Sequence, residues 1–167
     1  MSDFPVPFLP ANKYAAELIA TAKKIASPGK GILAADESTG TIGKRFKNIN
    51  VENNRENRRR YRELLFSTPN LNKNISGVIT YEETLYERDS NGTLLIDHLL
   101  KQDIVVGIKN DLGTRPLPGT NGEFYTQGLT DLDKRNAAYY QAGARFAKWR
   151  CVIKISNNTP SQQAIDE

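Results

Sequence analysis

The chain has 167 residues with a net charge of +4, and 38% of its residues are hydrophobic while 25% are charged. This composition excludes collagen, a coiled coil and wholesale disorder, and no apolar run approaches the roughly 18 residues of a membrane span. Residues 1–10 contain three prolines (Pro5, Pro7 and Pro10) and no basic cluster, so we expect an N-terminal arm rather than a signal or transit peptide. A soluble, cytoplasmic protein is the default expectation. The length suits one domain but falls short of the roughly 250 residues of an eight-stranded α/β barrel.

Helical and strand-like segments alternate along the chain. Apolar spacing of three and four residues predicts helices at 15–26, 42–49, 54–66, 94–101 and 132–144, with Tyr61, Leu64 and Leu65 packing the third. Apolar runs predict buried strands at 31–35, 75–81, 104–109 and 146–155, and residues 111–128 are expected to form an irregular loop. Strands separated by helices indicate parallel βαβ units, with both sheet faces covered.

The last predicted helix begins close to the end of the sequence. Thr159 is a good N-cap, Pro160 suits the first helical position, and a Gln stands three residues after the cap. The sequence therefore reaches less than two turns of this helix before Glu167.

The single cysteine and the single histidine argue against several kinds of site. Cys151 stands alone, so the chain has no internal disulfide or multi-thiolate metal site, and its apolar run predicts a buried, inert thiol. His98 has no partner histidine and is interpreted as structural or exposed, because zinc sites and Ser-His-Asp triads need more partners.

The net positive charge comes from one segment, residues 44–63, which carries +5 by itself. A local basic patch indicates an anionic partner, either nucleic acid or a phosphorylated small molecule. RNA binding would call for aromatic residues interleaved with the basic ones, but the one close by, Tyr61, is better explained as part of the core. No GxxxxGK[ST] or GxGxxG motif occurs, so we expect neither nucleic acid nor a nucleotide. Two interpretations remain for the helical stripe: a solvated face paired with glutamates, or arginines that reach a phosphate. The stripe consists of Arg55, Arg58, Arg59 and Arg62, and the nearby acids are Glu52, Glu56 and Glu63.

Polar residues follow each predicted strand, where parallel α/β folds place their chemistry. Lys148 and Arg150 share one side of the fourth strand because side chains alternate along a strand. Asp36, after the first strand, is a plausible partner for such costly buried cations. This pattern is open to two interpretations: a salt-bridge ladder inside a barrel, or a site for phosphate binding and amine chemistry. The other polar residues at strand ends are Ser38, Glu82, Glu83, Lys109 and Asp111.

A series of motifs in the same order along the chain resembles the class I fructose-bisphosphate aldolases, and the resemblance extends from about residue 19 to the last residue. The motifs are GKGILAADESTG at 29–40, ENRR at 56–59, ISGVI at 75–79, ETLY at 83–86, GIK at 107–109, TQGL at 126–129 and FAKWRCV at 146–152. The resemblance implies an α/β fold, the first four βα units of a TIM (β/α)8 barrel, with residues 11–167 forming a truncated half-barrel that ends after strand four. It also implies a homotetramer for the full-length family.

The implied reaction is reversible cleavage of fructose 1,6-bisphosphate to the triose phosphates, dihydroxyacetone phosphate and glyceraldehyde 3-phosphate, in glycolysis and gluconeogenesis. The family works through a lysine Schiff base and needs no cofactor and no metal. By resemblance, Asp36 handles protons and orients the substrate hydroxyls, and Lys148 assists carbinolamine chemistry. The implied substrate-binding residues are Ser38, Thr41, Lys109 and Arg150 toward the 6-phosphate, and Arg45 and Arg58 as phosphate-associated arginines. Arg59, Arg60 and Arg62 stay surface candidates.

Two departures from the family pattern stand out. After GIK the family commonly reads Val-Asp-Lys-Gly, whereas this chain has Asn110-Asp111-Leu112-Gly113 and lacks the cation. The family's imine-forming lysine and its acid/base glutamates belong to strands beyond Glu167, so we expect this chain to be inactive alone. The alternative is a non-catalytic half-barrel that binds phosphorylated ligands or a protein partner, although its open sheet edges would favour aggregation.

Overall fold

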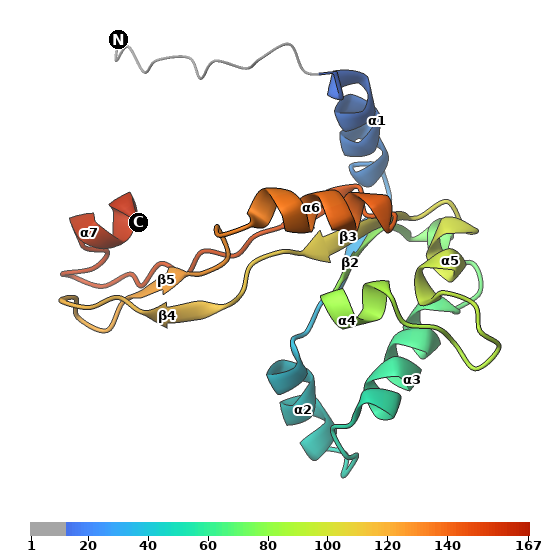
Figure 1. Cartoon of the computed structure of the whole chain (residues 1–167), viewed down its shortest axis with the longest axis horizontal. Coiled ribbons are helices and arrows are strands. Elements are labelled where there is room, and N and C mark those ends of the chain that lie inside the picture. The colour runs from blue at the N-terminus through green and yellow to red at the C-terminus, as the bar shows by residue number, and fades with distance from the viewer. Residues whose placement is uncertain (1–12) are drawn as a thin grey trace.

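The computed structural model describes residues 13–167, so the predicted arm at residues 1–10 lies outside the described residues. Its main sheet has four parallel strands in the order β1-β2-β3-β6 (Figure 1). These strands are β1 (Gly31–Ala35), β2 (Ile75–Thr80), β3 (Val105–Lys109) and β6 (Phe146–Lys148). The parallel α/β architecture predicted from the alternating segments is therefore confirmed.

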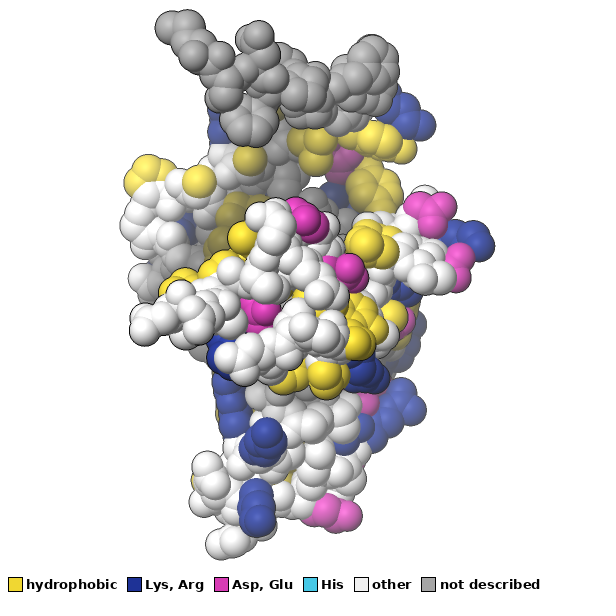
Figure 2. Space-filling model, turned by 90° about the vertical axis from the view of Figure 1, so that its left-hand side faces the viewer, with side chains coloured by type: hydrophobic (Ala, Val, Ile, Leu, Met, Phe, Trp, Pro, Cys, Tyr) yellow, Lys and Arg dark blue, Asp and Glu magenta, His cyan; other side chains and the backbone are white. Residues whose placement is uncertain are grey.

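The predicted helices are present, with small changes at their ends. They are α1 (Ala15–Ile25), α2 (Thr39–Lys47), α3 (Arg55–Phe66), α5 (Leu95–Leu100), α6 (Leu132–Gln141) and α7 (Gln162–Asp166), and a short 3₁₀ turn covers Leu71–Lys73. In Figure 1, α2 and α3 lie below the sheet, whereas α1 projects from the other side. Figure 2 shows Lys and Arg side chains in the lower part of one face, where α2 lies, and hydrophobic side chains across its middle.

Two parts of the fold were missed at the sequence level. The one-turn helix α4 (Glu82–Leu85) directly follows β2. Residues 111–128, predicted as an irregular loop, contain the antiparallel hairpin of β4 (Thr114–Pro116) and β5 (Phe124–Thr126). The chain reverses between these strands with Gly119 and Gly122 in the left-handed region, which glycine adopts at little cost.

The hydrophobic core lies where α3 and α5 cover β2 and β3. Phe66 from α3, and Leu95 and Leu99 from α5, have no exposed surface, and they cluster with Val78 and Val106 of the central strands. Full burial of each such side chain contributes roughly 1.5–3 kcal/mol. This core holds the carboxyl ends of the central strands in place.

The first strand is more exposed than predicted. β1 is an edge strand, so only Ala35 is fully covered, and Ile32 keeps 46% of its surface exposed. Leu64, expected to pack against the core, is 69% exposed because it points away from the sheet side of α3. The interpretation of residues 31–35 as a buried strand was wrong for this reason.

The fourth strand is much shorter than the predicted 146–155. Only Phe146–Lys148 pair with β3, and beyond them Ile153 and Ile155 are 58% and 85% exposed. Cys151 is exposed rather than buried, because it lies in this unpaired stretch.

The last helix begins two residues later than predicted. Its N-cap is Ser161, whose Oγ accepts a hydrogen bond from the Ala164 backbone N–H at 3.2 Å. Thr159 instead pairs with Ser156 through a backbone N–H···O bond of 2.9 Å. Among residues 13–167, no helix has the length and apolar character required to cross a membrane.

His98 has the structural position expected for it. Its Nε2 lies 2.9 Å from the Asp89 carboxylate, whose other oxygen accepts the backbone N–H groups of Asn91 and Thr93. The hydrogen bond with His98 lowers the pKa of Asp89 from its ordinary value, and the two backbone bonds lower it further. The pair therefore fixes the turn that leads into α5.

Candidate functional site

A cavity of about 500 Å³ lies at the carboxyl ends of the four parallel strands. Residues that follow every strand contribute to its wall, as expected for a parallel α/β sheet. The structure brings seven of the eight predicted site residues here: Asp36, Ser38, Thr41, Arg45, Lys109, Lys148 and Arg150. Arg58 is the exception. The wall is completed by Glu37, Tyr81, Glu82, Asp111, Leu112, Gly113, Thr114 and Tyr139.

The Asp36–Lys148 pair joins the two outer strands of the sheet. Lys148 Nζ donates to Asp36 Oδ2 at 2.7 Å, which confirms the partner predicted from the sequence. In a flat sheet, strands three positions apart would lie roughly 14 Å from one another. Since β1 and β6 occupy the two ends of the strand order, the sheet must curl toward the cavity for this contact to form.

A second lysine–carboxylate pair lies beside the first. Lys109 pairs in register with Lys148, and its Nζ donates to Asp111 Oδ1 at 2.7 Å and to the Asp111 carbonyl at 2.8 Å. Burial alone would raise the pKa of Asp111, but bonds from Lys109 and the Gly113 N–H lower it overall. Its second oxygen, Oδ2, has no hydrogen-bond partner among residues 13–167.

The wall formed by the β1–α2 connection is also charged. Arg45 pairs with the Glu37 carboxylate, and Ser38 Oγ lies 3.1 Å from Thr41 Oγ1. Ser38 precedes the first turn of α2, so the positive end of this helix adjoins the cavity. Arg150 is exposed, and within the described part of the chain its guanidinium has no hydrogen-bond or ion-pair partner. Among the cations of the cavity wall, Arg150 is therefore the one most available to an anion.

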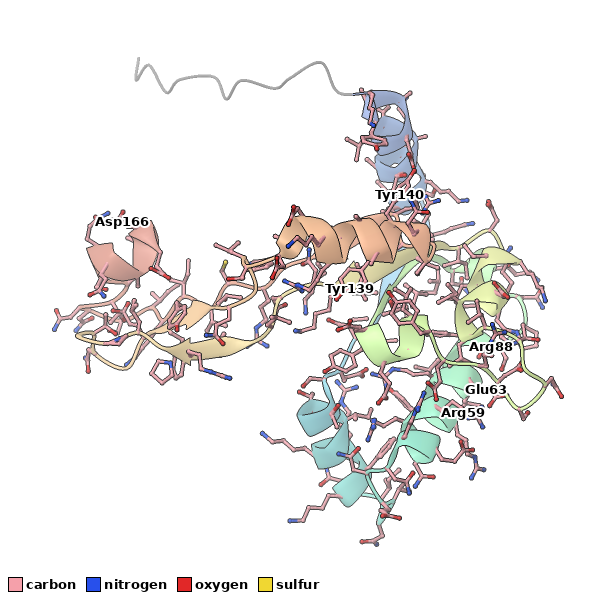
Figure 3. All side chains as sticks on the ribbon, in the orientation of Figure 1. Arg59, Glu63, Arg88, Tyr139, Tyr140 and Asp166 are labelled. Atoms are coloured by element: carbon pink, nitrogen blue, oxygen red, sulfur yellow. The ribbon has the colours of Figure 1, made fainter. Side chains whose placement is uncertain are left out.

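The sequence did not indicate several of the wall residues, among them Glu37 and Tyr139. Glu37 directly follows Asp36 and no sequence pattern marks it, although it is only 9% exposed and pairs with both Arg45 and Arg62. Tyr139 fitted a helical core pattern, and burial does raise its pKa. In Figure 3, Tyr139 extends from α6 toward α4 while its neighbour Tyr140 extends toward α1. Because the two tyrosines are adjacent in the sequence, the residue type alone does not show which of them faces the cavity and which faces α1.

Arg58 lies outside the cavity and is held by a carboxylate. Its Nε and Nη2 donate to the two Glu83 oxygens at 2.8 and 2.7 Å, and Nη1 donates to Asn53 at 3.1 Å. This bidentate bond lowers the pKa of Glu83 from its ordinary value. The structure therefore does not bring Arg58 together with the other predicted phosphate ligands.

Glutamates pair with the arginine stripe of α3, but only Arg59 pairs with the nearby acids that the sequence indicated, and the stripe is not a solvated face. Arg59 pairs with Glu56 at 2.8 Å and with Glu63 at 2.5 Å, and Figure 3 shows Arg59 and Glu63 along the same helix. Arg55 pairs with Glu87, which lies just after α4. Glu52, expected to join this network, instead accepts a hydrogen bond from Asn54.

Arg62 is buried, so its interpretation as a surface candidate was wrong. Only 2% of the residue is exposed, because it faces the sheet rather than solvent. Its guanidinium donates to the Ala35 carbonyl at 2.8 Å, and to the Glu37 carbonyl and carboxylate at 2.9 and 3.1 Å.

Comparison with known proteins matches this chain to one family along nearly its whole length. The profile described as "Glycolytic: Fructose-bisphosphate aldolase class-I" matches residues 17–167. The chain belongs to the class I fructose-bisphosphate aldolase family. It is 61% identical over 159 residues to a fructose-bisphosphate aldolase of Dictyostelium discoideum, covering 93% of this chain and 44% of that protein. It is 60% identical over 156 residues to the cytosolic fructose-bisphosphate aldolase 6 of Arabidopsis thaliana, again covering 93% and 44%.

A solved aldolase has the same fold over the shared region. The structure of the Plasmodium falciparum enzyme, in complex with TRAP and a small-molecule inhibitor, is 50% identical and superposes with a TM-score of 0.90. The superposition covers 94% of this chain and 46% of that one. The chain therefore spans less than half the length of these aldolase relatives, and its parallel sheet corresponds to part of the aldolase fold.

Proposed function

We propose that residues 13–167 provide the first four βα units of an aldolase barrel and that their cavity binds a phosphorylated sugar. The reaction would be the family's reversible cleavage of fructose 1,6-bisphosphate to dihydroxyacetone phosphate and glyceraldehyde 3-phosphate, in glycolysis and gluconeogenesis. The observation that carries the proposal is the convergence of Asp36, Lys109, Lys148 and Arg150 on one cavity. The cytosolic names of the plant relatives support a place in the cytoplasm, and a homotetramer belongs to the same proposal.

Each side chain has a proposed role that its surroundings support. Asp36, already bonded to Lys148, is suited to move protons and to orient hydroxyl groups of the substrate. Lys148 would assist carbinolamine chemistry as a proton donor held at a fixed position. Arg150 has no competing carboxylate among the described residues and would bind a phosphate directly, supported by Ser38, Thr41, Arg45 and Lys109. Arg58 would first have to release Glu83.

The first experiment tests Schiff-base chemistry by trapping with borohydride. The 167-residue polypeptide and the Dictyostelium relative are each incubated with dihydroxyacetone phosphate, reduced, and analysed by mass spectrometry. We expect the relative to gain a covalent adduct and the 167-residue polypeptide to gain none, because no lysine within it resembles the family's imine-forming lysine. An adduct on this polypeptide, on Lys148 for example, would contradict the proposed division of roles.

The second experiment tests phosphate binding and separates catalysis from binding alone. Isothermal titration calorimetry measures the binding directly, since the chain's single tryptophan, Trp149, does not line the cavity that holds Lys148 and Arg150. We expect saturable heat changes with inorganic phosphate and dihydroxyacetone phosphate, lost in Arg150→Met. The matched control is Lys134→Met, which removes a surface cation paired with Asp131 and should titrate like the parent chain.

Binding without trapping in the 167-residue polypeptide would match both the aldolase proposal and the alternative of a non-catalytic phosphate-binding half-barrel. Grafting residues 17–167 onto the remainder of the Dictyostelium relative distinguishes these two. We expect the hybrid to cleave fructose 1,6-bisphosphate. A folded hybrid without cleavage activity would favour the non-catalytic alternative.

A further inference from the structure

Arg62 holds the short segment that carries Asp36. Its Nε donates to the Ala35 carbonyl, and its Nη2 donates to the Glu37 carbonyl, so the guanidinium bonds the residues on both sides of Asp36. Arg62 belongs to α3, twenty-six positions further along the chain, and it does not line the cavity itself. These contacts hold the backbone at the peptide before Asp36 and at the peptide after Glu37, so the short stretch between them, which carries Asp36, is tied down at both ends.

A buried guanidinium is costly unless its donors and its charge are satisfied. Burial lowers the pKa of Arg62 from its ordinary value, and the negative charge of Glu37 opposes that effect. The planar guanidinium matches two acceptors in a fixed geometry, which the compact ammonium of a lysine does not. An apolar side chain would fill the same space at lower cost, so the arginine at this position indicates a requirement beyond packing.

The backbone held by Arg62 determines where the Asp36 carboxylate lies. Ala35 is the last residue of β1, and Ser38 is the N-cap of α2, so Asp36 lies in a connection without strand or helix bonds of its own. Asp36 must nevertheless meet Lys148 at 2.7 Å across the width of the sheet. In addition, the Glu37 carboxylate pairs with both Arg62 and Arg45 of the cavity wall. Arg62 is therefore linked to two proposed substrate contacts, Asp36 and Arg45.

We propose that Arg62 is a positioning residue that holds the Asp36 carboxylate against Lys148. This inference rests on the proposed function, because it assigns Arg62 a task in the same site. Arg62 does not line the cavity and acts through the Ala35 carbonyl and through the carbonyl and carboxylate of Glu37. It predicts that loss of the two carbonyl contacts loosens the Asp36–Lys148 pair while the neighbouring Lys109–Asp111 pair stays intact, since Arg62 contacts neither member of the latter.

Competitive acylation of lysines measures the two pairs separately in the 167-residue polypeptide. The protein is treated with trace acetic anhydride under native conditions, and the labelling rates of Lys148 and Lys109 are measured by mass spectrometry. An amine held as an ammonium on a carboxylate reacts slowly, so Asp36→Asn gives the rate for a fully released Lys148. Arg62→Met removes the contacts, and Arg62→Lys keeps the positive charge but lacks the planar guanidinium that reaches both carbonyls. Arg59→Met is the matched control on the same helix.

We expect Arg62→Met to label Lys148 about fivefold faster, approaching Asp36→Asn, because a charge-assisted hydrogen bond is lost. Arg62→Lys should fall between Arg62→Met and the parent chain, and Arg59→Met should equal the parent. Lys109 should keep its rate in all of these variants. If Arg62→Met does not fold, as judged by circular dichroism, Arg62→Lys decides the question by the same ratio.

An unchanged Lys148 rate in the folded Arg62 variants would overturn the proposal. An equal rise at Lys148 and Lys109 would also overturn it, because that result indicates a general loosening of the cavity. These outcomes are distinguishable from failure of the proposed function, which is decided by trapping, phosphate binding and the hybrid enzyme rather than by lysine reactivity in the ligand-free chain.

Discussion

The two sides of the cavity are stabilised in different ways. On the side of β2, β3, α3 and α5, apolar side chains are completely buried and arginine–glutamate pairs cross between elements. On the side of β6 and the residues that follow it, three residues pair with the sheet and large apolar side chains such as Ile153 remain exposed. Asp36 lies in the β1–α2 connection, which Arg62 of α3 holds, whereas Lys148 lies in β6. The Asp36–Lys148 pair therefore depends on both sides.

This difference indicates that stability and reactivity reside in different parts of the chain. Burial of apolar surface provides most of the stabilisation on one side. The geometry of the cavity depends instead on a few polar contacts at the ends of β1, β3 and β6. Substitutions should therefore separate the two contributions.

The largest expected effect comes from the buried core. Phe66→Ala removes a side chain with no exposed surface and should lower the free energy of unfolding by about 3–5 kcal/mol. Ile155→Ala, at a residue that is 85% exposed, should change it by no more than about 0.5 kcal/mol. Urea unfolding followed by circular dichroism measures both. Equal losses of unfolding free energy in the two variants would show that the exposed side contributes as much stability as the buried core.

The next effect tests the junction between the regions. A Cβ added at Gly107 would fall well under 3.0 Å from ring atoms of Phe146, so β3 and β6 approach closely only because this residue is glycine. Gly107→Ala should cost about 1–3 kcal/mol through overpacking. The double variant with Phe146→Leu should recover part of that loss, whereas Gly31→Ala, with open space around its Cβ, has no such clash. If Phe146→Leu does not restore stability to Gly107→Ala, the loss does not arise from a clash with the Phe146 ring.

A smaller effect is expected from the pair that joins α3 to α4. Arg58 and Glu83 form a bidentate bond, with 12% and 27% of their side chains exposed. A double-mutant cycle with Arg58→Met and Glu83→Gln should give a coupling energy of about 1 kcal/mol, reduced from a buried pair by partial solvent screening. Additive single losses would show that the two side chains act independently.

The smallest effect is a pH dependence of the same pair. Because Arg58 lowers the pKa of Glu83 in the folded state, its contribution is complete above the unfolded value of about 4.3. It is lost as the pH falls through the lower folded value. Urea midpoints measured between pH 7 and pH 3 should therefore fall less steeply on the acid side for Glu83→Gln than for the parent chain. Parallel curves for the two proteins would contradict this assignment.

The order of elements could be predicted because periodicity depends on local sequence. Apolar runs located all four strands of the main sheet, and polar residues at strand ends located most of the cavity wall, including the Asp36–Lys148 pair. Exposure could not be predicted, since it depends on the strand order: Ile32 is exposed because β1 is at an edge. Similarly, a helical stripe does not reveal that Arg62 faces the sheet while Arg59 pairs with glutamates of its own helix.

Lys109 and Lys148, adjacent in register, have a consequence for selectivity among anions. Each ammonium already has a carboxylate partner, Asp111 and Asp36 respectively, so an incoming anion finds no vacant positive charge on either lysine. Binding there is an exchange of partners, and its free energy is the difference between two ion pairs rather than the whole of one. A singly charged solvent anion gains little from such an exchange with a carboxylate. A phosphate dianion carries more charge and more acceptor oxygens, so this part of the cavity favours phosphate over chloride or acetate.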